Sequence, residues 1–264
     1  MSDAISRAVT RAEGFVLRVA PPLEREFWET LLRRRGAGPL LAALAAQQEP
    51  DWALRPWREP AAPDPALAAT LRGLGWLDAL GLLDHPVPER AASWLLARQQ
   101  EDGGWSEPLA SEQRRVALSG EVAGLLAKTP YARESALRRA EAFLARHWSV
   151  ELVQGPCYPP ILAYVHALAH LHSERADEVL QWCGRELERG FRTHAFGPVP
   201  VARVFLRARA RALPGLQIEP PELVATLLAA QAADGGWSAE PDVDRLDATL
   251  EAVEALLRLG PAAS

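Results

Sequence analysis

Two histidines, His166 and His170, stand four residues apart in an apolar stretch of this sequence. Residues at this spacing share one face of a helix, so the pair could chelate a metal or relay a proton if that face borders a cavity. The stretch is apolar on nearly all sides, which equally fits two core histidines that hydrogen-bond to their neighbours. Because no third protein ligand can be named, we predict no metal and no cofactor, and we keep both histidines as candidate catalytic residues.

Three charged residues stand in segments that are otherwise apolar, namely Glu121, Arg203 and Arg207. A charge within a buried helix needs a partner or a ligand. Glu121 is therefore a candidate acid or base, and the two arginines could bind a diphosphate or a carboxylate bidentately. Because Arg209 and Arg211 continue the basic run, the alternative is a solvated stripe on the helix.

Aromatic side chains could add to such a site. Tyr158, Tyr164, Phe196 and Phe205 could line a pocket and stabilise a cation through their ring faces. They could equally belong to an ordinary core. Tyr164 and Phe205 are the candidate substrate-binding residues, beside the two arginines.

The elements that must position these residues are predicted to be helices throughout. Alanine, leucine, arginine and glutamate dominate, runs of β-branched residues are missing, and proline or glycine clusters recur at short intervals. The segment 66–84 contains three glycines and could break into two helices. The twelve predicted helices are 2–18, 23–35, 38–48, 66–84, 88–100, 111–128, 132–147, 159–172, 174–190, 199–212, 219–231 and 244–259.

One segment recurs along the chain, as LLARQQEDGGW at 95–105 and LLAAQAADGGW at 227–237. The two copies are 132 residues apart, which is three steps of 44, and weaker copies occur at 44–52 and 143–148. A period in this range indicates stacked helical hairpins, because a single hairpin cannot bury its apolar face alone. Twelve helices make six hairpins, and no linker divides them, so we predict a single domain over residues 1–264.

The repeated segment predicts a tight turn against the helix before it. Asp-Gly-Gly allows a positive φ, and Trp105 or Trp237 can then pack its large ring on that helix. Gln99 or Gln231 can hydrogen-bond to groups left open at helix ends. The turn therefore serves to join hairpins.

Gln-x-x-Asp-Gly-Gly-Trp after an apolar helix resembles the QW repeat of squalene-hopene cyclases, oxidosqualene cyclases and class II diterpene cyclases, and is similar to the repeat of protein prenyltransferase β subunits. The resemblance covers roughly residues 38–259. It implies an α/α toroid, in which inner and outer rings of helices enclose an apolar cavity. The outer helices would include 88–100, 132–147, 174–190 and 219–231. The inner helices would include 111–128, 159–172, 199–212 and 244–259.

The same resemblance directs attention to an acid motif. Class II cyclases use Asp-x-Asp-Asp, whose central aspartic acid protonates an alkene or an epoxide, and the nearest match here is Asp242-Val243-Asp244-Arg245. Arg245 in the last position would favour an ionised Asp244 instead of a proton donor. The alternative is that Asp244 N-caps the last helix, with Asp247 at N3. Asp244 is kept as a candidate catalytic residue because this helix would be an inner one.

Protein prenyltransferases hold zinc with an Asp-x-Cys pair. Neither Cys157 nor Cys183 follows an aspartate by two residues, which argues against prenyltransferase chemistry and against its zinc. Two cysteines do not make a disulfide framework, so a reducing compartment is expected.

The net charge and the distribution of apolar residues indicate which partners and which cellular compartment to expect. The formal net charge of -5 gives no electrostatic reason to expect nucleic acid or an anionic membrane surface. The N-terminal stretch carries charges without a long apolar run, so no signal peptide is expected, and no segment reaches the ~18 consecutive apolar residues of a membrane span. We therefore expect a cytoplasmic protein.

Two functions fit these features. The first is a terpene cyclase-like enzyme that binds an apolar isoprenoid- or polyene-like molecule in a central cavity and promotes acid/base-assisted cyclisation or isomerisation. Its catalytic and substrate-binding candidates are the eight residues His166, His170, Asp244, Glu121, Tyr164, Arg203, Arg207 and Phe205. The alternative is a non-catalytic toroid that carries a ligand or serves as a scaffold for a partner protein. An open HEAT-like solenoid is disfavoured by the Asp-Gly-Gly-Trp turns.

Overall fold

The computed structural model describes residues 2–58, 63–155, 158–238 and 244–260, and within these ranges the chain forms helices and no strand. The predicted all-α class is confirmed. The thirteen helices of the described residues are α1 (Ser2–Val19), α2 (Pro22–Leu31), α3 (Gly38–Gln47), α4 (Pro65–Leu80), α5 (Pro86–Ala97), α6 (Glu112–Ala127), α7 (Glu134–Arg146), α8 (Val150–Val153), α9 (Tyr158–Leu168), α10 (Ala176–Arg192), α11 (Pro198–Ala208), α12 (Pro220–Ala229) and α13 (Arg245–Leu259).

Prolines and capping side chains set many of the helix boundaries. α2, α4, α5, α11 and α12 each begin at a proline, whose missing N–H is not needed in the first turn. Asp64 and Ser111 accept hydrogen bonds from first-turn amides of α4 and α6. The break considered for 66–84 does not occur, because α4 continues past its internal glycines and ends at Gly81, which has a φ of 71°. The short helix α8 was not predicted.

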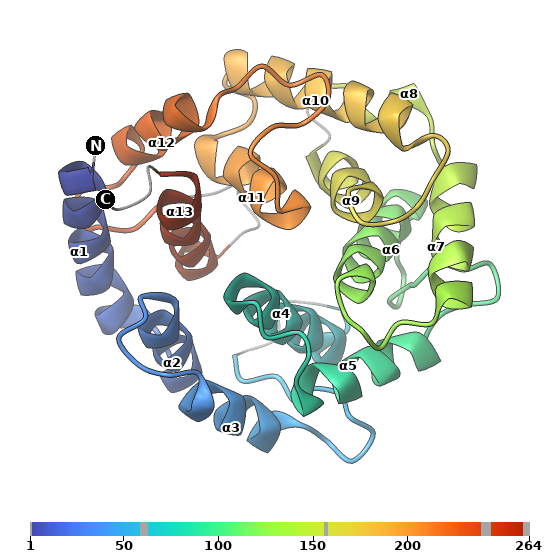
Figure 1. Cartoon of the computed structure of the whole chain (residues 1–264), viewed down its shortest axis with the longest axis horizontal. Coiled ribbons are helices and arrows are strands. Elements are labelled where there is room, and N and C mark those ends of the chain that lie inside the picture. Colours follow the sequence, from blue (N-terminus) through green and yellow to red (C-terminus); the bar gives the residue numbers. More distant parts are fainter. Residues whose placement is uncertain (1, 59–62, 156–157, 239–243, 261–264) are drawn as a thin grey trace.

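The helices surround the centre of the molecule in two layers (Figure 1). α4, α6, α9, α11 and α13 lie around the centre, and α1, α3, α5, α7, α10 and α12 lie outside them. α2 lies between α1 and α3 and packs on α4. At the other end of the chain, α1 packs on α12 and α13, so the first helix lies beside the last two.

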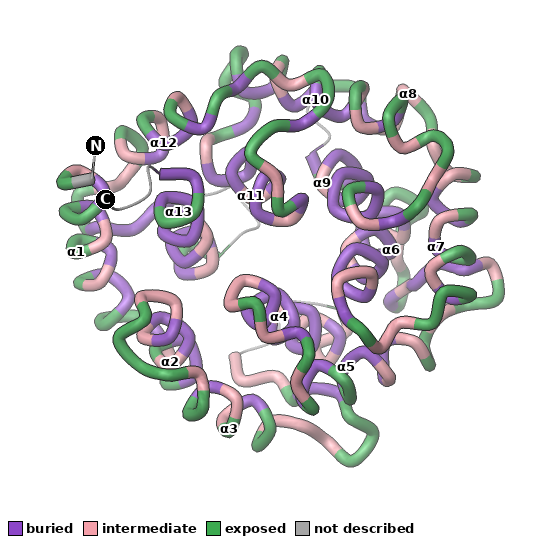
Figure 2. Tube along the Cα trace, viewed as in Figure 1, coloured by how far each residue is buried: buried purple, intermediate pink, exposed green. Residues whose placement is uncertain are grey.

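Burial follows this arrangement, as Figure 2 shows. The inner helices are buried over much of their surface, whereas the outer helices expose one side to solvent. On α10, for example, Val179, Cys183 and Leu187 recur every four residues on the buried side. Cys157 lies outside the described residues. Within the described ranges, no helix is long and apolar enough to cross a bilayer.

The two clear copies of the repeated segment form the same turn. Gly103 and Gly235 have φ values of 94° and 93°, as the Asp-Gly-Gly pattern predicts. The indole Nε1 of Trp105 donates to the carbonyl of Leu95 at 2.7 Å, and the second copy repeats this bond from Trp237 at 2.8 Å. Each tryptophan is buried and closes the last turn of the helix before it.

Each turn also holds the next outer helix. The side-chain amide of Gln99 donates to Ala136 of α7 at 2.9 Å, and that of Gln231 donates to Ala8 of α1 at 2.8 Å. A Cβ on Gly103 or Gly235 would collide with a backbone carbonyl of the same neighbouring helix. The second turn therefore ties the C-terminal part of the chain to its N-terminal helix.

In the weaker copy at 44–52, Trp52 does not occupy the position of Trp105 and Trp237 in the turn. Trp52 has a φ of 79° and stands where the clear copies have glycine. Leu54 takes the place of the buried tryptophan, since its amide donates to Thr70 Oγ1 at 3.0 Å as that of Trp105 donates to Ser119 Oγ at 2.8 Å. The motif is thus shifted by two residues at this turn.

In the copy at 143–148 a tyrosine from another helix binds the end of the preceding helix. The hydroxyl of Tyr164, on α9, donates to the carbonyl of Leu144 at 3.1 Å. Trp148 packs edge-on against the ring of Tyr164, with ring centroids 4.9 Å apart. Tyr164 therefore binds a carbonyl of the last turn of α7, one residue after the position that matches Leu95 and Leu227.

Candidate functional site

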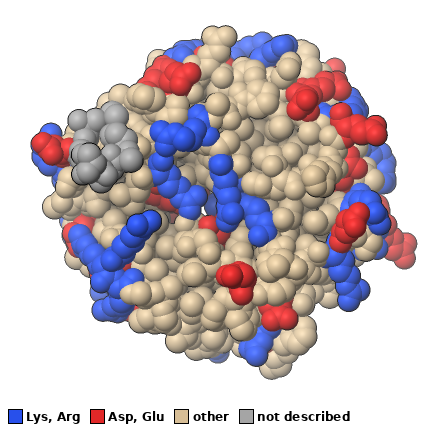
Figure 3. Space-filling model, in the orientation of Figure 1, with Lys and Arg blue, Asp and Glu red and all other residues tan. Residues whose placement is uncertain are grey.

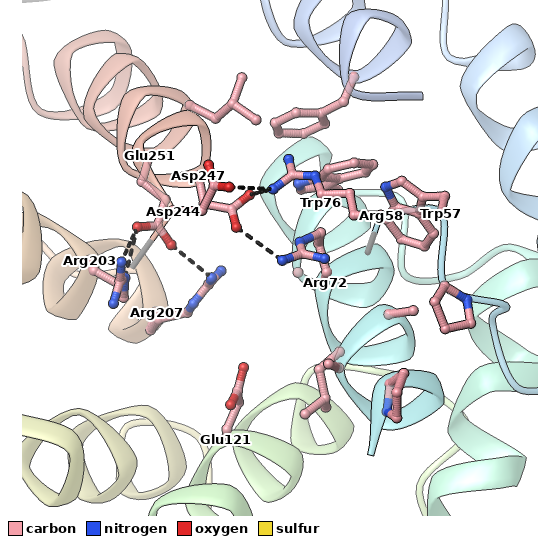
Figure 4. Close-up of a pocket in the computed structure, with 18 of the residues that line it drawn as sticks. Trp57, Arg58, Arg72, Trp76, Glu121, Arg203, Arg207, Asp244, Asp247 and Glu251 are labelled. Carbon is pink, nitrogen blue, oxygen red and sulfur yellow. Dashed lines mark hydrogen bonds and ion pairs between the residues drawn. The ribbon is translucent and has the colours of Figure 1, made fainter. Parts of the chain in front are cut away.

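A cavity of about 740 Å³ lies among the inner helices, and we call it the central cavity. Its lining comes from α2, α4, α6, α11 and α13 and from the segments just before α4, α6 and α13. Figure 4 shows part of this lining. The side chains from α11 and α13 lie on one side, and those from α4 and from the segment 56–58 lie on the other.

The lining is rich in charge, which the resemblance to cyclases did not lead us to expect. Five arginines and six acidic residues face the same space. The arginines are Arg58, Arg72, Arg114, Arg203 and Arg207. The acidic residues are Glu107, Glu121, Asp244, Asp247, Glu251 and Glu254.

One side of the central cavity is built around Asp247. Its two carboxylate oxygens lie 3.1 Å from Arg58 and 3.0 Å from Arg72. Arg58 also pairs with the buried Glu24, and its guanidinium lies 3.8 Å from Asp244. These ion pairs connect α2, α4 and α13 across the cavity wall.

Asp244 combines this contact with the capping role considered from the sequence. Its carboxylate accepts a hydrogen bond from the amide of Leu246 at 2.6 Å, at the start of α13. Arg245 does not pair with Asp244, because its guanidinium binds Asp234 of the repeated turn at 2.9 Å. Asp242 lies outside the described residues. The basic neighbour of Asp244 is thus Arg58, which the local sequence could not indicate.

A second group of ion pairs is built around Glu251, one turn after Asp247 on α13. Glu251 lies 2.7 Å from Arg203 and 3.3 Å from Arg207, so the two arginines share one carboxylate. Their side chains are only 12% and 20% exposed, so they line the cavity and do not form a solvated stripe. The guanidinium of Arg207 lies against Gly75 of α4, where there is no side chain to displace it.

Glu121 reaches the cavity from α6 (Figure 4). Among the described residues it makes no hydrogen bond and no ion pair, although Arg114 and Arg207 are close enough to interact with it electrostatically. The sequence singled out this residue as a charge on an apolar helix, and the structure places it where a ligand could meet it.

Glu254 is an acidic residue of the lining that the sequence did not suggest. It lies on the same face of α13 as Asp247, two turns further along, and its side chain is 6% exposed. Burial raises the pKa of its carboxyl group, although Arg258 lies 3.2 Å away and opposes the shift. The i, i+4, i+7 spacing of Asp247, Glu251 and Glu254 is the sequence signal that could have found it.

An aromatic wall borders the charged part of the cavity. The rings of Phe27 and Trp76 stack at 4.8 Å with planes 10° apart, and Trp57 lies tilted 5.4 Å from Trp76. The indole of Trp57 donates to Glu24 at 3.0 Å, which fixes the ring at the wall. No spacing in the sequence connects these three residues, since they come from α2, α4 and the segment between α3 and α4.

Four of the sequence candidates lie outside the central cavity. Phe205 is buried in the core, and Tyr164 serves the turn described above. His166 is 1% exposed and is enclosed between α9 and α6, where it packs against Gly124. His170 binds the carbonyl of Arg207 through Nε2 at 2.9 Å.

The two histidines do not form a pair suited to metal binding. Their rings are nearly perpendicular, with centroids 6.2 Å apart, and the described residues contain no group of three metal-ligating side chains. Burial lowers the pKa of both imidazoles, and nearby Lys128 acts in the same direction. The structure thus separates the histidines from Glu121, Asp244, Arg203 and Arg207, which it brings together around one cavity.

A second charged cluster lies at the C-terminal ends of the inner helices. Lys128, the only lysine, pairs with buried Asp78, and burial lowers its pKa to about 8. Arg209 pairs with the same aspartate, and Arg211 donates to the carbonyl of Arg258 at 2.8 Å. Cations at these positions compensate the negative ends of the helix dipoles. Figure 3 shows Lys and Arg side chains gathered near the centre of one face of the molecule.

No family model matches this chain, and a search of curated proteins finds no match.

Proposed function

We propose that the chain is an α/α toroid enzyme of the terpene cyclase and prenyltransferase type, which binds a small molecule in the central cavity and promotes its cyclisation or isomerisation by proton transfer. The two layers of helices and the two equivalent turns support the toroid assignment. The ligand's apolar part would lie on the wall formed by Phe27, Trp57 and Trp76.

The observation that carries the proposal is the position of Glu254, which lines this cavity with a side chain only 6% exposed, so that burial raises the pKa of its carboxyl group. A carboxyl group with a raised pKa keeps its proton closer to neutral pH and can act as a general acid. Glu254 would donate its proton to a carbon–carbon double bond, which leaves a carboxylate and a carbocation. The carboxylate would then remove a proton from a neighbouring carbon, so the product is a neutral isomer and Glu254 is restored.

The experiment is a survey of products by mass spectrometry. The full chain is incubated with polyenes and prenyl alcohols, and we expect one or more isomerised or cyclised products. Glu254→Gln should abolish their formation because glutamine has no acidic proton, whereas Glu112→Gln, an exposed change on α6, should leave it unchanged. Product formation that persists in Glu254→Gln would contradict the proposal.

A second candidate is a carrier that binds its ligand without turnover. It is favoured by the role of Asp244, which is the central aspartate of the match to the cyclase acid motif but caps α13 and lies 3.8 Å from Arg58. Tight binding of a ligand that is recovered unchanged from the wild-type chain would support the carrier over the enzyme.

A further inference from the structure

On one side of the central cavity, acidic groups outnumber arginines. Arg58 and Arg72 both pair with Asp247, and Arg58 also lies beside Glu24 and Asp244. Two guanidinium groups are thus surrounded by three carboxylates. An anionic ligand group here would have to compete with carboxylates that are already in place.

The remaining arginines are also paired. Arg203 and Arg207 share Glu251, and Arg114 binds Glu107 through Nε at 2.6 Å. Each of the five arginines of the lining therefore has at least one carboxylate partner.

Glu121 is the exception among the acidic residues, because it has no hydrogen bond or ion pair with any described residue. The positions outside the described residues contain no lysine, arginine or histidine, so none of them can supply a basic side chain to it. Arg114 and Arg207 act on Glu121 only at longer range, and both are directly paired with other carboxylates. A carboxylate that faces a cavity with no directly paired cation is complementary to a cation brought by the ligand.

We infer that the ligand of the central cavity carries a protonated amine, which pairs with Glu121 while its apolar part lies on the aromatic wall. This inference rests on the proposed role of the central cavity as a ligand site and adds the chemical class of the ligand. The site would accept an amine-bearing polyene or a related apolar amine, and would disfavour prenyl diphosphates and fatty acids.

Arg58 is the arginine of the lining at which an anionic ligand group could be expected to bind instead. Its Nη1 lies 3.1 Å from Asp247, whereas its buried Nη2 has no hydrogen bond or ion pair with the described residues and could donate to a ligand oxygen. With three carboxylates around it, this guanidinium suits a neutral acceptor such as a hydroxyl better than a second anion. A ligand with both an amine and a hydroxyl could pair with Glu121 and accept a hydrogen bond from Arg58.

The inference is tested by isothermal titration of the full chain with octylamine, octanol and octanoate, which share a chain length and differ in charge. We expect octylamine to bind at least about tenfold more tightly than octanol, and octanoate more weakly than either. Glu121→Gln should remove the preference for the amine and leave the affinity for octanol unchanged. Glu121→Asp, which keeps the charge, should retain part of the preference.

Two controls separate this inference from the proposed catalysis. Glu112→Gln removes an exposed charge from the same helix and should not change the preference. Glu254→Gln removes the proposed proton donor, and the preference should persist in it. Equal affinities for octylamine and octanoate, or an unchanged preference in Glu121→Gln, would overturn the inference even if the cavity binds octanol and the enzyme turns over.

Discussion

Glu254 differs in its surroundings from the other two carboxyl groups of α13 that line the central cavity. Asp247 and Glu251 each lie between two arginines, whereas Glu254 is more deeply buried and has a single close partner in Arg258. The cost of burying charge is therefore offset less completely at Glu254, which explains why its pKa is raised.

This difference predicts how stability changes with pH. The folded pKa of Glu254 lies above its ordinary value of 4.5, so its protonation stabilises the fold below that pH, and this contribution is lost as the pH rises through the folded pKa. We expect Glu254→Gln to weaken the decline in unfolding free energy as the pH rises above 4.5. Urea unfolding at a series of pH values measures this slope, and equal slopes for the variant and the wild type would contradict the assignment.

At the residue scale, the charged residues of the central cavity could be predicted from the sequence better than its aromatic residues. Glu121, Arg203 and Arg207 were recognisable because a charge on an apolar helix needs a partner. Trp57 and Trp76 gave no such signal, since an aromatic residue fits an ordinary core equally well. The histidine pair had the required spacing, but spacing on one helix does not determine whether that face borders the cavity.

At the scale of elements, the turn at 48–54 departs from the two clear copies. A tryptophan occupies its left-handed position, although L-residues pay about 1–2 kcal/mol there and glycine does not. The indole of Trp52 is also 47% exposed, so little apolar burial offsets this cost.

We therefore expect Trp52→Gly to raise the free energy of unfolding by up to about 1 kcal/mol. Gly235→Ala, which adds a side chain at the equivalent position, should destabilise the fold because its Cβ would collide with the carbonyl of Arg11. Thermal or urea unfolding measures both changes. A clear loss of stability in Trp52→Gly would show that the exposed indole has a stabilising contact.

The glutamines of the two clear turns make a second prediction at this scale. Gln231→Ala removes the hydrogen bonds to Ala8 and Gly235, which should cost about 1–3 kcal/mol and loosen α1. Hydrogen exchange should then be faster in α1 and unchanged in α7. Gln99→Ala is the matched control, because it should loosen α7 and leave α1 protected. Identical exchange patterns in the two variants would rule out separate clamping of the two helices.

The helices themselves followed closely from the sequence because their signals are local. Proline starts, glycine ends and the repeated turn all act within a few residues, so twelve of the thirteen described helices were anticipated. The two-residue shift at Trp52 was missed because a comparison of the sequences alone matches Trp52 with Trp105 and Trp237. Only the hydrogen bond to Thr70 and the positive φ show that Leu54 takes the buried place.

At the scale of the whole molecule, the site depends on contacts between distant parts of the chain. The pair of Arg72 and Asp247 joins residues 175 positions apart, and the bond from Gln231 to Ala8 spans 223 positions. No periodicity reports such contacts, so the sequence could suggest a cavity at the centre of the helices but not which charges meet there. Charge pairing across the cavity is what makes Glu121 and Glu254 stand out.

The most direct test of the proposed chemistry is deuterium incorporation from solvent. The full chain is incubated in D₂O with amine-bearing polyenes, and the recovered compounds are analysed by mass spectrometry. Proton donation by Glu254 predicts carbon-bound deuterium in the isomerised product and in part of the recovered substrate, with incorporation lost in Glu254→Gln and kept in Glu112→Gln. Turnover without carbon-bound deuterium, or equal incorporation in Glu254→Gln, would contradict the account.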